Sequence, residues 1–377
     1  MAQHTGEERL RSLDDVEVVV DTDAHVTESV ADLLPYMEEK HEGLRRIVAD
    51  AAHPEHDVYS VAHPMPPFIH TEAFGDVYGD QPTGTVEAKQ SEMAEFDLDY
   101  SVLNPTINLA LATVNNDHMA VALANAYNSW ILDQFVEGNE EHIVTPIVAA
   151  PQAPDEAAEE IDDRADEDGV VGVTIPATGL VPPPGHRWFD PIYEAAQDND
   201  LPVLFHSGSG ATADSFPVVR KWAETYAEDH AVVHPFSHMW NLTSMLFQGV
   251  PARFPDLTFV FQEAGIAWIP YMNWRLDDHY LELSDEIPGL DKLPSKYVED
   301  QFYFSTQPLG HTARNPRHLA MALEMAGPEN VMYSSDLPHP DFDPPEELFD
   351  RIKGHFDAET VNAIMGGTAA DVFGLEV

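Results

Sequence analysis

Short apolar segments recur along the whole chain, and their number and spacing restrict its fold more than any other feature. Most of them are continuously hydrophobic rather than alternating, which is typical of parallel strands that are buried on both faces. The pattern predicts eight strands, at Val16–Val20, Tyr100–Leu103, Ile143–Val148, Val170–Ile175, Leu201–Phe205, Leu257–Phe261, Phe302–Phe304 and Val331–Tyr333.

Stretches with apolar residues at three- and four-residue spacing lie between most of these strands and predict helices. They are Val86–Phe96, Asp117–Phe135, Asp155–Asp168, Pro191–Asp198, Ser237–Gln248, Trp268–Leu283 and Pro316–Met325, followed by a closing helix at Glu359–Phe373. Barrels and doubly wound sheets share this alternation, and the position of the polar chemistry separates them. Because eight is the barrel number, we expect an α/β fold of the (β/α)8 TIM barrel type, with the doubly wound sheet as the alternative.

One segment interrupts this rhythm. The region Lys40–Pro82 is rich in Pro and His, as in AHPMPPFIH, and has little periodicity. We interpret it as an insertion between the first and second strands that forms a cap over the mouth of the barrel. With no convincing domain boundary elsewhere, we expect a single barrel domain over residues 1–377, a length that barrel folds often reach as one unit.

Acidic residues dominate the charge, because 67 Asp and Glu stand against 18 Lys and Arg and give a net charge of −49. A surface of this sign repels nucleic acids and anionic membranes, so neither is expected as a partner. The 44% of hydrophobic residues, with 18 Phe, 12 Tyr and 6 Trp, argues against disorder. Acidic helical runs such as Asp155–Asp168 indicate a solvated surface suited to concentrated salt, so we expect a halophilic protein.

Cysteine is absent, which excludes disulfides, thiolate nucleophiles and zinc–thiolate sites. Any metal must therefore be bound by His and carboxylate side chains. The first residues, MAQHTGEERLRSLDD, contain no apolar signal segment, and no uncharged run approaches the roughly 20 residues that span a bilayer. We expect a soluble, cytoplasmic protein.

Side chains that bind metals or transfer protons follow several of the expected strands. The first strand is followed by DTDAH, in which Asp23 and His25 point the same way from an extended chain. His206 follows the fifth strand, Glu263 the sixth and Asp336 the eighth. Each alone is as well explained by a turn, a helix cap or a buried core residue. Together they mark the carboxyl edge of the strands, where barrel enzymes build their active sites, and they predict a metal centre there.

Several long segments stand in an order that is informative as a whole: DTDAHVTES, ANAYNSW, FDPIYEAA followed by LPVLFHSGSG, GVPARFPDLTFVFQEAGIAWIPYMNWRLDDHY, and YSSDLPHPD. Between about Val16 and about Phe373 the chain thereby resembles the amidohydrolase superfamily. Within it, the likeness is to the amidohydrolase-2 family, the branch that contains aminocarboxymuconate-semialdehyde decarboxylase and γ-resorcylate decarboxylase. The resemblance implies a metal bound by four ligands, namely Asp23, His25, His206 and Asp336.

The sequence departs from the family pattern at two site positions. Asp23 replaces the first member of the usual H-x-H or E-x-H motif, which keeps an oxygen ligand and adds negative charge. Glu263 stands where the family has a catalytic His. Two-metal members of the superfamily bridge their ions with a carbamylated Lys on the fourth strand, whereas VVGVTIP has no Lys. We therefore expect one divalent ion, Zn²⁺ in the first place, with Mn²⁺ or Fe²⁺ as alternatives.

The resemblance implies a metal-dependent enzyme that acts on a small organic carboxylate or a cyclic or aromatic compound. In hydrolysis, the ion activates water, Asp336 takes its proton, and Glu263 orients the water or protonates the leaving group. In decarboxylation, the ion chelates the substrate carboxylate and an acid protonates carbon, a step that normally falls to the missing His. Its absence favours hydrolysis, with decarboxylation and a non-catalytic ligand-binding barrel as alternatives. His206 joins Asp336 and Glu263 in the expected catalytic set.

Three further residues are candidates for substrate binding. Arg275 could clamp a substrate carboxylate or pair with a neighbour in WRLDDHY. His238, like His234 and Trp240, could reach the pocket or serve only as a buried structural residue. His339 lies three residues beyond the eighth-strand ligand and could support it. The family leads us to expect a homodimer that acts on a small molecule.

Overall fold

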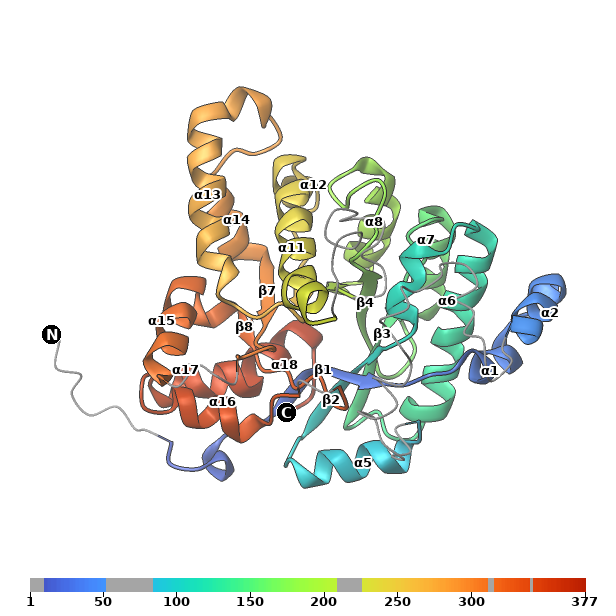
Figure 1. Ribbon diagram of the computed structural model, residues 1–377, viewed down its shortest axis with the longest axis horizontal. Helices are drawn as coiled ribbons and strands as arrows, with labels where there is room; N and C mark the ends of the chain where they lie inside the picture. Colours follow the sequence, from blue (N-terminus) through green and yellow to red (C-terminus); the bar gives the residue numbers. More distant parts are fainter. Residues whose placement is uncertain (1–9, 52–83, 209–225, 311–314, 340–341) are drawn as a thin grey trace, which may run out of the picture.

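The computed structural model describes residues 10–51, 84–208, 226–310, 315–339 and 342–377, and within them eight parallel strands are surrounded by helices (Figure 1). The strands follow one another in chain order around the sheet. They are β1 (Val20–Val26), β2 (Tyr100–Pro105), β3 (Ile143–Val148), β4 (Val170–Pro176), β5 (Val203–His206), β6 (Phe259–Gln262), β7 (Phe302–Ser305) and β8 (Val331–Met332).

Backbone hydrogen bonds link the two edges of this sheet. The amide of Thr22 in β1 donates to the carbonyl of Tyr333, just beyond β8, at 3.2 Å, and the amide of Asp336 donates to the carbonyl of Asp23 at 2.9 Å. A doubly wound sheet keeps its edges apart and does not run in chain order. The fold is therefore a (β/α)8 TIM barrel, as the sequence predicts.

Helices cover the outside of the barrel (Figure 1). The longer ones are α2 (Glu42–Ala51), α5 (Val86–Glu95), α6 (Asp117–Ile131), α7 (Pro154–Arg164), α8 (Asp190–Asp198), α11 (Tyr226–Phe247), α13 (Trp268–Leu283), α14 (Pro294–Gln301), α15 (Pro316–Ala326) and α16 (Pro345–Ile352). Shorter helices are α1 (Val30–Leu33), α12 (Val250–Arg253), α17 (Ala358–Asn362) and α18 (Thr368–Phe373). Side-chain caps begin several of them, as where Asn116 accepts a hydrogen bond from the amide of Met119 at the start of α6.

The first strand lies later in the chain than its expected position at Val16–Val20. Strand β1 runs from Val20 to Val26, so DTDAH is part of the strand rather than the turn after it. Asp21, Asp23 and His25 are fully buried. Polar residues occupy this strand because its carboxyl-terminal half faces the candidate site. The register shifts between Asp21 and Ala24, and such a bulge redirects the side chains that follow it.

Helix α11 begins earlier than its expected start at Ser237. It runs from Tyr226 and passes through Pro235. A proline inside a helix removes one hydrogen bond, but burial of neighbouring side chains such as Val233 and Leu242 offsets that loss. The additional turns bring His230 and His234 onto the helix that faces the end of β6.

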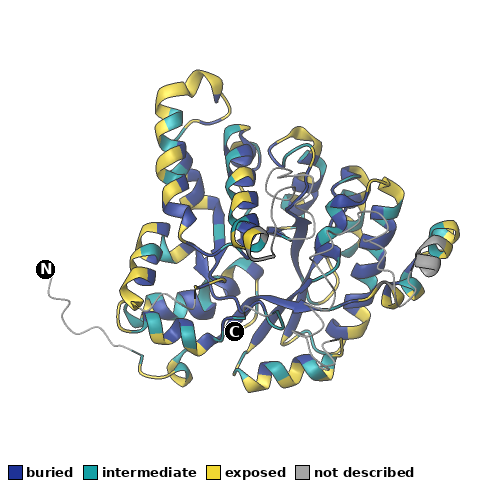
Figure 2. Ribbon diagram, viewed as in Figure 1, coloured by how far each residue is buried: buried dark blue, intermediate teal, exposed yellow. Residues whose placement is uncertain are grey.

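The core has two layers. Inside the barrel, apolar side chains from six strands form a cluster that Phe373 of α18 closes at the amino-terminal end: Val20, Val102, Val144, Leu204, Val260 and Met332. Outside it, residues such as Phe205 and Phe259 pack against Ile192 of α8 and Leu242 of α11. Figure 2 shows the strands buried and the outer helix faces exposed. Because this apolar cluster fills the amino-terminal end of the barrel, polar side chains are placed at the opposite, carboxyl-terminal end.

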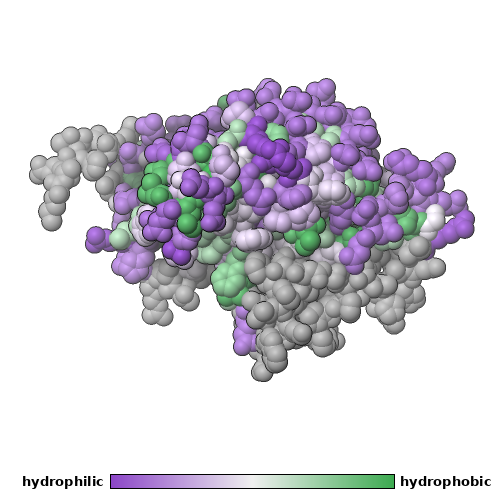
Figure 3. Space-filling model, turned by 90° about the horizontal axis from the view of Figure 1, so that it is seen from above, coloured by the Kyte–Doolittle hydropathy of each residue, from purple (hydrophilic) through white to green (hydrophobic). Residues whose placement is uncertain are grey.

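On the face drawn in Figure 3, the described residues are mostly hydrophilic, with scattered hydrophobic residues among them. Among the described residues, no helix has the length and apolar character needed to cross a membrane. The cap expected over Lys40–Pro82 begins with α2, which lies beside α1 at the edge of the molecule (Figure 1). Residues 52–83 lie outside the described residues, so the cap and the single-domain boundary stay predictions.

Candidate metal centre

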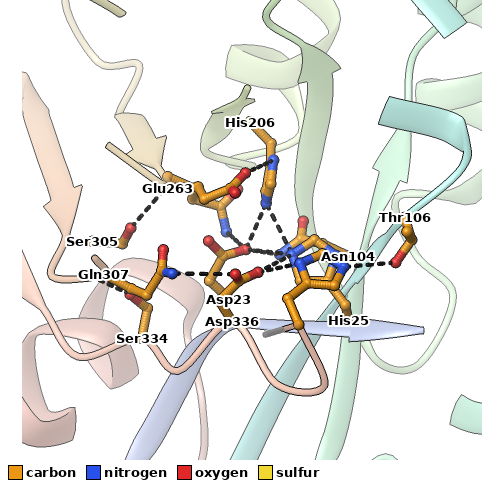
Figure 4. Close-up of polar contacts among 12 residues, drawn as sticks. Asp23, His25, Asn104, Thr106, His206, Glu263, Ser305, Gln307, Ser334 and Asp336 are labelled. Atoms are coloured by element: carbon orange, nitrogen blue, oxygen red, sulfur yellow. Dashed lines mark hydrogen bonds and ion pairs between the residues drawn. The ribbon is translucent and has the colours of Figure 1, made fainter. Parts of the chain in front are cut away.

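Four of the predicted site residues converge at the carboxyl end of the strands (Figure 4). Oδ1 of Asp23 lies 2.9 Å from Nε2 of His206 and 3.4 Å from Nε2 of His25. Oδ1 of Asp336 lies 3.2 Å from Nε2 of His25. All four side chains are fully buried. Residues that are 313 positions apart in the chain, from Asp23 to Asp336, therefore meet in one cluster because β1 and β8 are neighbours in the barrel.

The two imidazoles of this cluster are oriented by backbone carbonyl groups. Nδ1 of His25 lies 2.9 Å from the carbonyl oxygen of Pro105 at the end of β2, and Nδ1 of His206 lies 2.7 Å from that of Ser207. A carbonyl only accepts, so both Nδ1 atoms donate. In the neutral rings, the lone pair of each Nε2 then points to the centre of the cluster, which is the orientation that histidine ligands of metals adopt.

Asp23 is held by amides from two other strands. Its Oδ1 accepts hydrogen bonds from Nδ2 of Asn104 at 3.0 Å and Nε2 of Gln262 at 3.4 Å. Its Oδ2 is buried and has no hydrogen-bond partner among the described residues. Burial raises the pKa of this carboxyl, but the adjacent His206 and His25 outweigh burial and lower it below its usual value. Asp23 is thus an ionised carboxylate with one oxygen still to be satisfied.

Asp336 is fixed by its backbone and by three side chains. Its φ of 64° lies in the left-handed region, which a non-glycine residue adopts at a cost and which is enriched at functional sites. Oδ1 lies 2.5 Å from Nδ1 of His339, and Oδ2 accepts from Nε2 of Gln307 at 3.1 Å. Burial raises the pKa of Asp336, but the charge of His339 and the hydrogen bond from His25 lower it well below its usual range.

The donor set fits a divalent cation. Two buried carboxylates require a compensating positive charge. Burial lowers the pKa of His25, but the carboxylates of Asp23 and Asp336 raise that pKa well above its usual value. Two imidazole Nε2 atoms lie 3.1 Å apart in this cluster, and Oδ2 of Asp23 is buried without a hydrogen-bond partner among the described residues. Imidazole and carboxylate ligands without sulfur suit Zn²⁺, Mn²⁺ or Fe²⁺.

Glu263 lies beside this cluster rather than within it. Its φ of 58° is left-handed, and its amide donates to Oγ of Ser305 at 3.1 Å. Its Oε2 lies 3.6 Å from Nδ1 of His206 and 3.1 Å from Nδ1 of His234 on α11. Oγ of Ser207 lies 2.6 Å from that same nitrogen of His234. An imidazole from α11 therefore pairs with Glu263, the carboxylate that the resemblance places where the family has a histidine.

The three residues expected to bind substrate lie at different distances from the cluster. His339 is next to it, with its ring 4.2 Å from that of His25 and its Nε2 3.2 Å from Oγ1 of Thr106. His238 lies behind the end of β6, where Nε2 donates to the carbonyl of Gln262 at 2.6 Å. Arg275 is exposed on α13, and no described contact joins its side chain to the cluster. Of the three, only His339 has a described contact with one of the four clustered residues.

A family model described as amidohydrolase matches residues 20–375, which is almost the entire chain. The chain belongs to the amidohydrolase family. As an amidohydrolase it is a metal-dependent enzyme, and the resemblance noted in the sequence is confirmed. This membership also explains why the candidate ligands fall on β1, β5 and the segment after β8, since barrel enzymes use that edge for catalysis.

Solved structures similar to this amidohydrolase share its fold over nearly the full length. 5-Carboxyvanillate decarboxylase from Sphingomonas paucimobilis is 21% identical, with a TM-score of 0.70 over 95% of this chain and 99% of that chain. An amidohydrolase from Mycobacterium avium subsp. paratuberculosis is 18% identical, with a TM-score of 0.73 over 94% and 99%. A dihydroxybenzoic acid decarboxylase from Polaromonas, solved with manganese and 2-nitroresorcinol, is 15% identical, with a TM-score of 0.66 over 95% and 97%.

Several residues that support the site of this amidohydrolase were missed in the sequence. Asn104 is the second-last residue of β2, Gln262 ends β6, and Gln307 lies two residues beyond β7. Each occupies the carboxyl end of an expected strand, so the signal was present in their positions. Amide side chains are so common in turns that position alone did not distinguish them. The pairing of His234 with Glu263 depended on the early start of α11 and had no comparable signal.

Proposed function

We propose that this amidohydrolase is a metal-dependent, non-oxidative decarboxylase of small hydroxylated aromatic acids. One observation carries the proposal: Nδ1 of His234 lies 3.1 Å from Oε2 of Glu263, beside the candidate metal centre. Decarboxylation needs an acid that protonates carbon when carbon dioxide leaves. A paired carboxyl and imidazole can hold and deliver that proton.

This pairing reverses the preference for hydrolysis that was inferred from the sequence. That preference rested on the replacement of the family's histidine by Glu263. His234 supplies an imidazole from α11 instead. The lack of a histidine at the end of β6 therefore no longer argues against protonation of carbon. The solved decarboxylases with the same fold point in the same direction.

We infer that Asp23, His25, His206 and Asp336 hold one divalent ion. When bound, such an ion polarises a substrate carboxylate and an adjacent oxygen as a Lewis acid. Zn²⁺ and Mn²⁺ both suit this donor set. Manganese gains support from the Polaromonas decarboxylase, whose structure contains that ion.

The residues around this centre divide the remaining work of the reaction. The bond between the ring carbon and the carboxylate carbon breaks, carbon dioxide leaves, and the electron pair stays on the ring carbon. Glu263 and His234 together deliver the proton that this carbon takes up, and Ser207, 2.6 Å from Nδ1 of His234, orients the imidazole. Gln307 and His339 keep Asp336 in place through its two carboxylate oxygens.

The substrate class follows from the same chemistry. A hydroxyl next to the carboxylate supplies the adjacent oxygen and stabilises charge that develops on the ring. The similar structures include enzymes for 5-carboxyvanillate and 2,6-dihydroxybenzoate, which both have this arrangement. We therefore propose ortho-hydroxybenzoates as the first compounds to test.

The test is an assay of the metal-loaded enzyme in D₂O against dihydroxybenzoates and 5-carboxyvanillate, followed by NMR. We expect loss of the carboxylate, release of carbon dioxide and one deuterium on the carbon that carried it. A parallel panel of lactones, amides and esters examines the hydrolase alternative, for which Asp336 would take a proton from water. Turnover of that panel without carbon dioxide release would refute the decarboxylase proposal.

Two expectations about the whole protein remain proposals. We propose a homodimer, and light scattering of the purified chain at several concentrations measures the molar mass that tests it. We also propose a cytoplasmic location, and fractionation of the source cells shows in which fraction the protein is found. Neither result affects the assignment of the reaction, because every side chain used above comes from a single chain.

A further inference from the structure

We propose that His230, His234 and Glu263 form a second divalent metal site, next to the first and separate from it. Each of the three offers one ligand atom, and these atoms all lie within 4.8 Å of one another. His234 and Glu263 are buried, and His230 is half-buried. The site shares no residue with the set formed by Asp23, His25, His206 and Asp336.

The spacing on α11 brings both imidazoles to the same face. His230 and His234 are four residues apart on one helix, so they lie one above the other. Their ring centroids are 4.9 Å apart, at an interplanar angle of 68°. Two histidines at this spacing on a helix are a recurrent way to hold zinc, with a further ligand from another element. Glu263, which follows β6, is that further ligand here.

The distances allow coordination after small side-chain rotations. Ligand bonds to Zn²⁺ of about 2.0–2.1 Å in a tetrahedron place ligand atoms about 3.3 Å apart. Nδ1 of His234 and Oε2 of Glu263 already lie 3.1 Å apart. The ligand atom of His230 lies within 4.8 Å of the other two, and half-burial leaves its side chain room to rotate. Because it has three protein ligands, one of them near solvent, this site should bind more weakly than the four-ligand centre.

The environment favours a cation at this place. The chain has a net charge of −49, which raises the local concentration of divalent cations around it. A second cation close to the first is tolerated because Glu263 lies between the two, with Oε2 3.6 Å from Nδ1 of His206. A bound ion would also remove His234 and Glu263 from proton transfer. This last consequence, inhibition by excess divalent metal, rests on the proposed function.

The proposal is tested by counting bound Co²⁺ in equilibrium dialysis of the holoenzyme. Molar NaCl in the buffer suppresses diffuse binding to surface carboxylates. We expect a tight equivalent and a second, weaker equivalent in the unmodified chain. His230→Ala should lose only the second equivalent. The matched control is His318→Ala, which removes an exposed imidazole on α15 and should retain both.

A second variant guards against a folding defect in His230→Ala. His230→Gln keeps a polar side chain of similar length and should also lose the weaker equivalent. The proposal is overturned if the unmodified chain binds a single Co²⁺, or if the folded His230 variants keep the second. Because the readout is metal bound rather than carbon dioxide released, its failure is separate from failure of the decarboxylase proposal.

Discussion

Nε2 of His206 lies 3.1 Å from Nε2 of His25, although both rings use Nδ1 to donate to backbone carbonyl oxygens. If both rings were neutral, their Nε2 lone pairs would face each other; Asp23 and Asp336 counter this by raising the pKa of His25 well above its usual value. Such lone pairs repel unless a positive charge lies between them, and Oδ1 of Asp23 adds a carboxylate 2.9 Å from His206. The two histidines therefore need a positive charge between them, which a proton on His25 or a bound cation can supply.

The first prediction concerns the tight metal. The purified chain should contain one divalent ion per molecule after weakly bound metal is removed, and chelation should abolish activity. His206→Ala should lower this content severely because it removes a ligand atom. His238→Ala is the matched control, since its ring donates to the carbonyl of Gln262 behind the site. Equal metal loss in both variants, measured by elemental analysis, would mean that the ligand assignment is wrong.

The second prediction concerns Glu263 as part of the proton donor. Glu263→Gln should keep the tight metal and the fold but lower turnover by about 10²-fold, which is typical of lost general acid–base catalysis. Glu286→Gln, a conservative change at an exposed carboxylate after α13, should leave turnover unchanged. Metal content and kcat are the two measurements. If Glu263→Gln empties the tight site instead, Glu263 is a ligand and the proposed division of roles fails.

The barrel could be predicted from sequence because its signal is repeated along the chain. Continuous apolar runs such as Leu201–Phe205 are buried on both faces and stand out from the helices between them. The first strand was misplaced because Asp21, Asp23 and His25 are polar yet fully buried. Hydrophobic patterning assigns such residues to a turn. Burial of a polar cluster is a tertiary property that the local pattern does not contain.

The candidate site was predictable to the extent that barrel topology determines it. Strand order brings the ends of β1, β5 and β8 together, so the nearness of Asp23, His206 and Asp336 followed from the fold. Their roles as ligands stay predictions. The contact between His234 and Glu263 was not predictable, because it depends on where α11 begins and on the left-handed backbone of Glu263. Neither feature leaves a periodic signal.

The third prediction follows from the net charge of −49. Transfer of the metal-loaded protein from molar NaCl to dilute buffer should lower its Tm, because surface carboxylates then repel one another without screening. For a chain of this size, each kcal/mol of lost stability corresponds to a Tm shift of about 2 °C. Sucrose at matched osmolality is the control, since it favours the compact state without screening charge. An unchanged Tm across the salt range would remove the halophile hypothesis.

The fourth prediction concerns acid stability and His238. Burial beside Phe261 and Trp268 lowers the pKa of His238 to about 3, which outweighs the hydrogen bond to the Gln262 carbonyl that raises it. The charges of His206 and His234 lower this pKa further, and that of Asp23 opposes them. The unfolded chain binds this proton near pH 6.5, so between pH 3 and pH 6.5 it holds more protons than the native state. The stabilising contribution of the neutral ring is fully present above pH 6.5 and is lost as the pH falls.

His238→Gln isolates this contribution, because glutamine can still donate to the Gln262 carbonyl but does not titrate. The free energy of unfolding of the unmodified chain should fall relative to the variant by about 1.4 kcal/mol per pH unit below pH 6.5. Urea unfolding at pH 7, 6 and 5 in molar salt measures that difference. His318→Gln, at an exposed imidazole, should show no such slope. If the free energy of unfolding depends on pH in the same way for His238→Gln and the unmodified chain, His238 is protonated in the folded protein. Its assignment as a neutral residue behind the site would then be wrong.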